Sequence, residues 1–309
     1  MELIDQTTVL TGVGFCPPAL REHIIKGHPE TGKKWLADLP ALLKSAEKIW
    51  QLSLGACFPD ASFNFVAPVT RADGSQAVLK CGLPTLALCN EIAALRHFNG
   101  QGAVKLLQAD EEQGLFLLDK VEPGTLLETH TDPDYATRLA VELMQRLHKP
   151  LNTPGSFQTL ADLFKGFDDL YQRFDGKTGP FPSVLIDHAQ GISRELLDSQ
   201  SAPVLLHGDL HYANILLSKA NGAIAIDPKG FIGEPEYETP LPRLTPELTK
   251  KVLRRRLDVL IEMSGFDRER IIAWLFAKAT LAAWWSFEDT GEISLPFLEC
   301  AERVLEIGI

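Results

Sequence analysis

The spacing of apolar residues predicts a small sheet region in the first 121 residues of the chain. The alternating segments there are joined at Asp73-Gly74, a dipeptide typical of hairpin turns. In chain order the pattern predicts a helix over Leu39–Trp50, strands over Phe63–Thr70 and Gln76–Lys80, a helix over Leu86–Phe98, and strands over Val104–Ala109 and Leu115–Val121.

After a break at Pro123-Gly124 the pattern becomes mostly helical. One short hairpin interrupts it, with Ile215–Leu217 and Ala223–Ile226 on either side of Asn221-Gly222. Helices are expected from Asp132-Pro133, over the apolar face between Leu160 and Phe174, from Thr245-Pro246 to about Gly265, and as a final pair from Asp267 through Trp274 and Trp285.

This order of elements indicates an α+β protein with two lobes. We expect an N-terminal extension over residues 1–38, an N-lobe over residues 39–122 with a small antiparallel sheet, and a mostly helical C-lobe over residues 123–309. A chain of 309 residues is long enough for two such units. The pattern of the extension is hard to interpret and predicts no function for it.

Charge and cysteine content narrow the class of protein. The formal net charge of −11 disfavours non-specific binding to nucleic acid or to anionic membranes. The five cysteines form no C-x-x-C pair and fit reduced thiols in the cytosol. No secretory signal is expected at the N-terminus, and no stretch approaches the roughly 20 apolar residues of a membrane span. We therefore expect a cytoplasmic protein with neither nucleic-acid nor membrane partners; its oligomeric state is not predicted.

The strongest chemical signal lies in LLHGDLHYANILLSKANGAIAIDPKG, residues 205–230. Asp209 precedes a predicted tight loop, Asn214 follows five residues later, and Asp227 ends the hairpin. Phosphoryl transfer needs an aligned acceptor hydroxyl and Mg²⁺ held by hard oxygen ligands. The layout matches the kinase pattern H-R-D-x-x-x-x-N followed by a metal-binding Asp, with Gly208 in place of the Arg. We predict that Asp209 is catalytic and that Asn214 and Asp227 bind Mg²⁺.

Turn formation alone explains any one of these polar residues, because Asp, Asn and Gly favour turns. It does not explain all of them at these spacings around an apolar hairpin. His207 is expected to support the backbone through hydrogen bonds, and His211 either is solvated or lines the site. Without the Glu of H-E-x-x-H, a zinc protease is not indicated.

The sheet region supplies a second signal, a possible buried ion pair. Lys80 ends a predicted strand, where it is either an exposed residue or a ligand of nucleotide phosphates. Glu91 interrupts the apolar stripe of the following helix, and a carboxylate on such a face normally needs a partner. We predict that Lys80 and Glu91 pair.

Two segments match phosphate-binding loop patterns in part. Leu54–Asn64 precedes the hairpin but keeps only Gly55 of a glycine-rich loop, so its backbone N–H groups and Ser62 would contact the phosphates. Gly27–Lys34 nearly matches a Walker A sequence, but Lys34 replaces the final Ser or Thr and no strand precedes it. We interpret the second segment as a solvated loop.

The segments HGDLHYAN and AIDPKG resemble motifs of the aminoglycoside phosphotransferase superfamily, whose fold is protein-kinase-like. AIDPKGFIGEPEYE is more narrowly similar to the aminoglycoside/hydroxyurea resistance kinase branch, which includes streptomycin 6-phosphotransferases, and the resemblance covers about residues 50–290. It implies ATP and Mg²⁺ as cofactors, Asp209 as catalytic base, Asn214 and Asp227 as Mg²⁺ ligands, Lys80 on the ATP phosphates, Glu91 positioning Lys80, and backbone groups near Leu118 and Val121 on the adenine.

Substrate signals are weaker. Acidic residues follow the metal motif, and acidic residues also follow two tryptophans in a late predicted helix. If they face the cleft, these residues would suit a cationic acceptor. A solvated acidic surface with core tryptophans explains them equally well. The candidates are His211, Lys229, Glu234, Glu236, Glu238, Trp285 and Glu288.

The expected activity is ATP-dependent transfer of the γ-phosphate to a hydroxyl of a small molecule, with an aminoglycoside such as streptomycin as the leading acceptor. A metabolic kinase acting on a sugar or an amino alcohol is the alternative within the same class. A nucleotide-binding regulator with an inactive kinase fold is the alternative from another class, and it predicts the loss of at least one essential polar residue. Lys80, Glu91, Asp209, Asn214 and Asp227 are all present.

Overall fold

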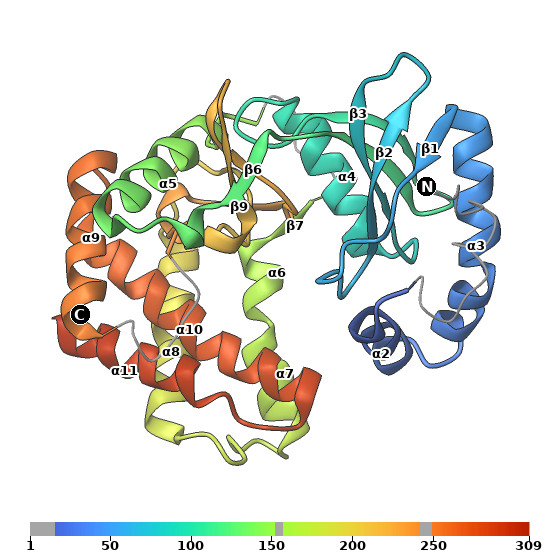
Figure 1. The fold of residues 1–309 in the computed structure, drawn as a ribbon. Helices are drawn as coiled ribbons and strands as arrows, with labels where there is room; N and C mark the ends of the chain where they lie inside the picture. The colour runs from blue at the N-terminus through green and yellow to red at the C-terminus, as the bar shows by residue number, and fades with distance from the viewer. Residues whose placement is uncertain (1–15, 152–156, 242–248, 309) are drawn as a thin grey trace. The chain divides into compact units, whose positions relative to one another are not determined.

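The computed structural model of the chain describes residues 16–151, 157–241 and 249–308 (Figure 1). It divides into two compact units, Met1–Val121 and Glu122–Ile309. The α+β class predicted from the sequence is confirmed: the first unit contains an antiparallel sheet, and the second is mostly helical.

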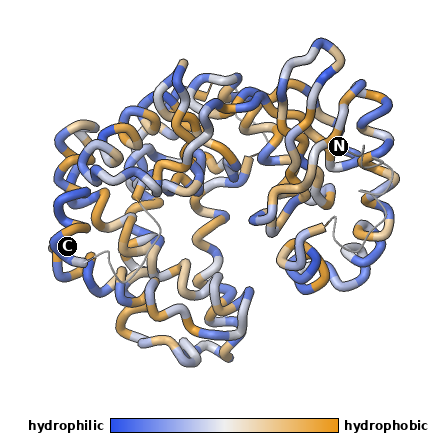
Figure 2. Tube along the Cα trace, in the orientation of Figure 1, coloured by the Kyte–Doolittle hydropathy of each residue, from blue (hydrophilic) through white to orange (hydrophobic). Residues whose placement is uncertain are grey.

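The first unit is built on a five-stranded antiparallel sheet in the order β1-β2-β3-β5-β4. Its strands are β1 (Leu52–Leu54), β2 (Phe65–Arg71), β3 (Gln76–Cys81), β4 (Leu106–Asp110) and β5 (Leu115–Asp119). As predicted, β2 and β3 form a hairpin at Asp73-Gly74, where Gly74 takes a φ of 82° that favours glycine. Figure 2 shows hydrophobic positions along much of these strands.

Helices cover both faces of this sheet. Helices α2 (Pro18–Gly27) and α3 (Thr31–Trp50) place Leu20, Trp35 and Leu43 in one core with alternate residues of β2 and β3. Helix α4 (Leu86–Phe98) packs on the opposite face of the sheet. Successive residues of a strand point to opposite faces, so Lys80 points to the α4 side and contacts Glu91 there. Helices therefore cover both faces of the sheet, but Val66 and Val78 on the α4 side stay partly exposed.

Two expectations for residues 1–50 are corrected by helices α2 and α3. Helix α3 begins at Thr31 rather than at Leu39, and α2 precedes it in a stretch where no element was predicted. The Gly27–Lys34 segment is mostly exposed, as expected, but it is a helix junction rather than an irregular loop. Gly32 is buried in this junction, and it packs so closely against α2 that a Cβ atom would lie 2.6 Å from the Ile24 carbonyl oxygen. The apolar spacing of four from Trp35 through Leu39 to Leu43 was the available signal.

The second unit contains two small sheets among helices. One sheet has the order β10-β9-β6 and the other the order β7-β11-β8. The strands are β6 (Pro123–Leu126), β7 (Gln158–Thr159), β8 (Val204–Leu206), β9 (Ile215–Ser218), β10 (Gly222–Ala225) and β11 (Phe231–Gly233). Three 3₁₀ turns accompany them among the described residues, η1 (Leu127–Thr129), η2 (Tyr212–Asn214) and η3 (Pro235–Tyr237).

Helices α7, α8 and α11 of the second unit pack on α10 (Arg268–Thr290), and α5 packs on α9. The others are α5 (Pro133–Leu147), α6 (Leu160–Phe164), α7 (Gly166–Arg173), α8 (Ser183–Asp198), α9 (Lys250–Ser264) and α11 (Leu295–Gly308). Asp267 caps α10 as predicted, by accepting a hydrogen bond from the Arg270 N–H. Two helices follow Asp267 as expected, α10 and α11, but α10 alone carries both Trp274 and Trp285.

The start expected for the preceding helix, Thr245-Pro246, lies outside the described residues; helix α9 itself begins at Lys250 and is capped by Thr249. Among the described residues, no helix is both long and apolar enough to cross a bilayer.

Candidate active site

His207 holds the loop that presents Asp209. It follows strand β8 and is fully buried. Its Nε2–H donates to the Ile226 carbonyl oxygen at 2.8 Å, and its Nδ1 accepts from the Asp209 N–H at 3.3 Å. These partners require the neutral Nε2–H tautomer, and burial lowers the pKa of His207 in agreement with a neutral ring. The predicted supporting role of His207 is confirmed.

The backbone around His207 is closed on both sides. Its carbonyl oxygen accepts hydrogen bonds from the N–H groups of Lys229 and Gly230, at 2.7 and 3.2 Å. Gly208 has a φ of 84°, and a Cβ atom there would lie 2.5 Å from the Phe231 ring. Glycine therefore replaces the arginine of the kinase pattern at a position where a side chain would be both strained and obstructed.

Asp209 presents a carboxylate with its side chain 38% exposed, between two basic groups. Lys229 Nζ lies 3.8 Å from one carboxylate oxygen, and His211 Nε2 lies 3.8 Å from the other. The carboxylate is thus accessible and faces a cation that can also attract a negatively charged ligand.

Asn214 and Asp227 are brought together by the hairpin of β9 and β10. Asn214 ends η2 directly before β9, and the Ile226 N–H donates to its carbonyl oxygen at 2.9 Å, which places Asp227 next to it. The Asn214 Nδ2 donates to the Asp209 carbonyl oxygen at 2.9 Å. Because that carbonyl only accepts, the amide nitrogen faces it and Oδ1 is the atom left to coordinate a cation. Asp227 is exposed and has a φ of 60°.

These residues fit a magnesium ion better than a transition metal. The described residues contain no group of three or more His, Cys, Asp or Glu side chains that could hold a metal. Mg²⁺ is commonly bound through one or two protein oxygens, with phosphate oxygens and water completing its octahedron. The Asn214 amide oxygen and the Asp227 carboxylate form a donor set of that type.

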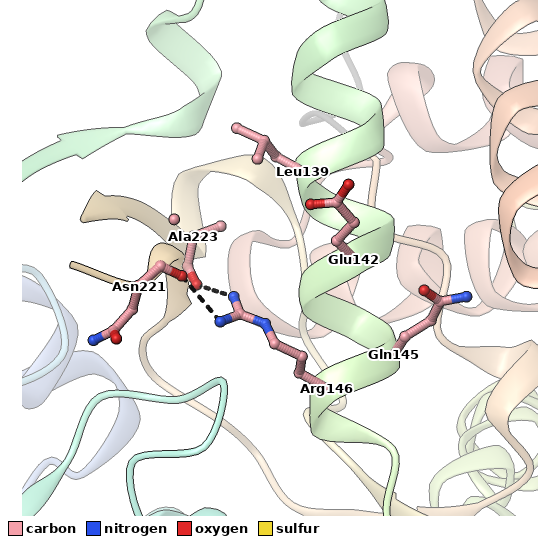
Figure 3. Close-up of a pocket in the computed structure, with 7 residues that line it drawn as sticks. Leu139, Glu142, Gln145, Arg146, Asn221 and Ala223 are labelled. Carbon is pink, nitrogen blue, oxygen red and sulfur yellow. Dashed lines mark hydrogen bonds between the residues drawn. The ribbon is translucent and has the colours of Figure 1, made fainter. Parts of the chain in front are cut away.

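Arg146 of helix α5 holds the far end of the same hairpin. Its guanidinium donates to the carbonyl oxygens of Asn221, at 3.0 Å, and Ala223 (Figure 3). These groups line a surface pocket of about 390 Å³ together with Glu142. The pocket lies at the turn of the hairpin, so Arg146 supports the hairpin from the end opposite Asn214 and Asp227.

Glu238 was expected to face the substrate, and the structure corrects this expectation. It is 1% exposed, and its carboxylate accepts the N–H groups of His207 at 2.6 Å and Gly208 at 3.0 Å. Burial alone would raise the pKa of Glu238, but His148 and Lys278 lower it. Glu238 is therefore an anionic anchor of the loop before Asp209.

His148 was missed by the sequence analysis. It caps helix α5, and its Nε2 lies 3.7 Å from the Glu238 carboxylate. Its sequence context, Arg146-Leu-His148-Lys-Pro150, carries no recognisable signal for this contact.

Glu234 is likewise a structural residue and not a surface for the substrate. It is fully buried, and its carboxylate accepts hydrogen bonds from Arg270 Nε at 2.7 and 2.8 Å, from the Trp274 indole N–H, and from the Ser201 N–H at 3.1 Å. A buried carboxylate with these partners joins α10 to the turn after β11.

The remaining substrate candidates lie in different surroundings. Glu236 is partly buried, and its Oε2 is buried without a hydrogen-bond partner among the described residues. Trp285 is partly exposed, and its Nε1 lies close to Gly166 at the start of α7. Glu288 is mostly exposed. The limited burial of its carboxyl group and the nearby negative charges of Asp169 and Asp289 raise its pKa. Asp169, which the sequence analysis missed, therefore belongs to an acidic group with Glu288.

The first unit contains the predicted ion pair. Lys80 Nζ lies 2.6 Å from Glu91 Oε1, and the two residues are 4% and 8% exposed. The Lys80 ammonium also lies 5.5 Å from the centre of the Phe116 ring. The prediction that these residues pair is confirmed.

The other predicted nucleotide contacts lie in the same unit. Ser62 is partly buried in the loop between β1 and β2. Leu118 is 5% exposed within β5, and Val121 is partly exposed after it. Their contacts with a nucleotide stay predictions.

Solved structures of kinases share the fold of this protein. The choline kinase LicA from Streptococcus pneumoniae matches with a TM-score of 0.59 at 14% identity, over 86% of this chain and 97% of that chain. A thermostable mutant of the aminoglycoside phosphotransferase APH(4)-Ia, solved with ADP and hygromycin B, matches with a TM-score of 0.58 at 12% identity, over 86% and 98%. The predicted protein-kinase-like fold is confirmed.

The chain belongs to the aminoglycoside/hydroxyurea antibiotic resistance kinase family, whose model matches residues 50–290. It is 29% identical over 286 residues to a streptomycin 6-kinase of Streptomyces glaucescens, covering 88% of this chain and 91% of the relative. It is 30% identical over 297 residues to a hydroxyurea phosphotransferase of Kitasatospora aureofaciens, covering 94% and 86%. The protein is therefore a kinase of small molecules, and the alternative of a non-catalytic regulator is set aside.

Proposed function

We propose that this kinase transfers the γ-phosphate of ATP to a hydroxyl of an aminoglycoside such as streptomycin. The observation that carries the proposal is the network of backbone hydrogen bonds joining His207, Asn214 and Ile226, which gathers Asp209, Asn214 and Asp227 in one unit. Similarity to streptomycin 6-kinases supports the choice of acceptor.

Asp209 aligns the acceptor hydroxyl and takes its proton in this proposal. As the acceptor oxygen bonds to the γ-phosphorus, the bond from that phosphorus to the β,γ-bridging oxygen breaks and ADP leaves. Lys229, 3.8 Å from the Asp209 carboxylate, is placed to meet the negative charge of the transferred group. Alignment and charge neutralisation are the main requirements of such a transfer.

Asn214 and Asp227 would hold Mg²⁺ through the amide oxygen and the carboxylate. When bound, the ion neutralises phosphate charge. In the first unit, Lys80 would contact the α- and β-phosphates and Glu91 would orient it, Ser62 and the backbone of its loop would contact phosphate oxygens, and the backbone near Leu118 and Val121 would meet the adenine.

A cationic acceptor is supported by two carboxylates of the second unit. Glu236 has a buried oxygen without a partner among the described residues, and Glu288 belongs to an acidic group beside the partly exposed Trp285. A guanidinium or ammonium group on a sugar would pair with these carboxylates and lie against the indole ring. His211, 28% exposed beside Asp209, would line the acceptor site.

A second candidate acceptor is a small uncharged hydroxyl compound such as hydroxyurea. The observation that favours it is the 30% identity to a hydroxyurea phosphotransferase over 94% of this chain. This acceptor would not need Glu236 or Glu288, so variants of these residues distinguish the two candidates.

The test is an ATP-consumption screen with Mg²⁺ over streptomycin, other aminoglycosides, hydroxyurea and simple amino alcohols, followed by phosphorus NMR of the product. We expect a phosphate ester of streptomycin, and a fall in kcat of about 10²- to 10⁴-fold for Asp209→Asn. Glu236→Gln and Glu288→Gln should raise the KM for streptomycin and leave the KM for ATP unchanged. Full activity of Asp209→Asn, or consumption of ATP with hydroxyurea alone, would overturn the proposal.

A further inference from the structure

Helix α2 reaches the loop between β1 and β2 through one side chain. His23 Nδ1 donates a hydrogen bond to the Ser62 carbonyl oxygen at 3.1 Å. The imidazole also stacks on Phe63, with ring centres 4.8 Å apart and planes inclined by 12°. Both partners lie in the loop formed by residues 55–64, which connects the paired strands β1 and β2.

The first half of this loop is fixed by the sheet itself. The Gly55 N–H donates to the Pro68 carbonyl oxygen and the Phe58 N–H to the Val66 carbonyl oxygen, both at 2.8 Å. A Cβ atom on Gly55 would lie 2.9 Å from the Pro68 oxygen, so the chain passes close to β2 there. Beyond Phe58 the loop leaves the strand, and it is Ser62 and Phe63 in this second half that His23 contacts.

Helix α2 is itself firmly attached to the sheet. Leu20, one turn before His23, and Ile24, the residue after it, are 0% and 6% exposed in the core shared with β2 and β3. Gly32 at the start of α3 packs against Ile24 at a distance that admits no side chain. His23 therefore extends from a rigid platform, and the loop is held by a segment that precedes the residues matched by the family model.

We propose that His23 is a positioning residue for the nucleotide: it holds the second half of loop 55–64 in the shape that receives the ATP phosphates. This inference rests on the proposed function, which assigns that loop to the phosphates. A loop already ordered in the free protein loses less conformational entropy when ATP binds, so its backbone N–H groups and the Ser62 hydroxyl bind phosphate oxygens more tightly.

The test compares His23→Ala with the full-length protein by amide hydrogen exchange and by steady-state kinetics. We expect exchange at residues 60–64 to rise about 3- to 10-fold, the scale of one exposed hydrogen bond and one ring stack. The KM for ATP should rise by about the same factor, with kcat and the KM for the acceptor unchanged. His23→Asn should restore part of the protection, because its Nδ2 takes the place of the imidazole Nδ1 as donor.

His28→Ala is the matched control, because His28 is an exposed histidine at the C-cap of the same helix. It should leave both measurements as in the wild-type protein. Unchanged exchange at residues 60–64 in His23→Ala overturns the inference even if the wild-type protein phosphorylates streptomycin. Faster exchange with an unchanged KM for ATP also overturns it, because the contact would then stabilise a loop without serving the nucleotide. If the wild-type protein binds no ATP, the proposed function fails, whatever the exchange shows.

Discussion

The pairing of Lys80 with Glu91 was predictable at the scale of single residues, because one carboxylate on an apolar helix face needs a partner. The roles of Glu238 and Glu234 were not. Glu238 accepts from an N–H group 31 residues earlier in the chain, and Glu234 from a side chain 36 residues later. Local spacing identifies the oxygen ligands of a site, but it does not distinguish an acid that faces a ligand from one that supports the backbone behind it.

Burial of the Lys80–Glu91 pair gives the first prediction. We expect Glu91→Leu to lower the free energy of unfolding by about 3–5 kcal/mol, because it leaves the Lys80 ammonium buried without its carboxylate. The double variant Lys80→Met/Glu91→Leu should regain most of that loss, since two apolar side chains of similar volume replace the pair. Urea unfolding measures both.

The exposed pair of Arg96 and Glu111 is the control, with side chains 51% and 39% exposed. Glu111→Leu should change the free energy of unfolding by less than about 1 kcal/mol. A double variant at Lys80 and Glu91 as unstable as the single one would contradict the explanation by burial.

At the scale of elements, strands β2–β5 of the first sheet and helix α4 were predictable from period and turn residues, and α4 has the predicted bounds, Leu86–Phe98. Strand β1, only three residues long, was not predicted. Helix α2 was not predicted. Its buried residues Leu20 and Ile24 are few, and the proline at its first position, Pro18, is compatible with a helix start but does not by itself indicate one. Short amphipathic helices whose apolar residues cover a sheet depend on that sheet for their stability, and local propensity indicates them poorly.

The hairpin of β9 and β10 gives the second prediction. Arg146→Ala removes the donors to Asn221 and Ala223 at its turn, so the hairpin should open more often while its strands keep their pairing. We expect amide exchange at residues 219–223 to rise, and the concentration of Mg²⁺ needed for half-maximal rate to rise about 3- to 10-fold, the scale of two hydrogen bonds to a charged group on a partly exposed surface.

Arg138, exposed on the same helix, is the control for a lost charge. Arg138→Ala should leave both quantities unchanged. An equal effect of the two variants would mean that Arg146 acts through its charge rather than by holding the turn.

At the scale of the whole molecule, the buried neutral His207 ties stability to pH. Its folded pKa is lowered by burial, whereas in the unfolded chain an imidazole binds a proton near pH 6.5. As the pH falls below about 6.5, His207 binds a proton in the unfolded state but not in the folded state. The free energy of unfolding therefore decreases, by at most about 1.4 kcal/mol per pH unit.

We expect His207→Gln to be less stable at pH 7.5, because it loses the acceptor for the Asp209 N–H, but to lose less stability than the wild-type protein between pH 7.5 and 5.5. Urea unfolding at the two pH values measures the difference. The lowered pKa of Glu238 acts only below about pH 4.5 and stays outside this window. An equal decrease in both proteins would show that the other histidines account for the pH dependence.

Asp227 has a left-handed backbone conformation, which residues with a side chain rarely adopt. The residue that the proposed reaction requires at this position is therefore not the one that gives the most stable backbone. At a φ of 60° the backbone of a glycine is less strained than that of an aspartate. Asp227→Gly should therefore melt at the same temperature as the wild-type protein or higher, yet turn over no substrate. Asp175, an exposed aspartate with a φ of 53°, allows the same relief at a place without assigned chemistry, and Asp175→Gly should keep full activity. Selection for heat tolerance alone would favour glycine at both positions, whereas selection that also demands turnover would preserve the aspartate only at residue 227.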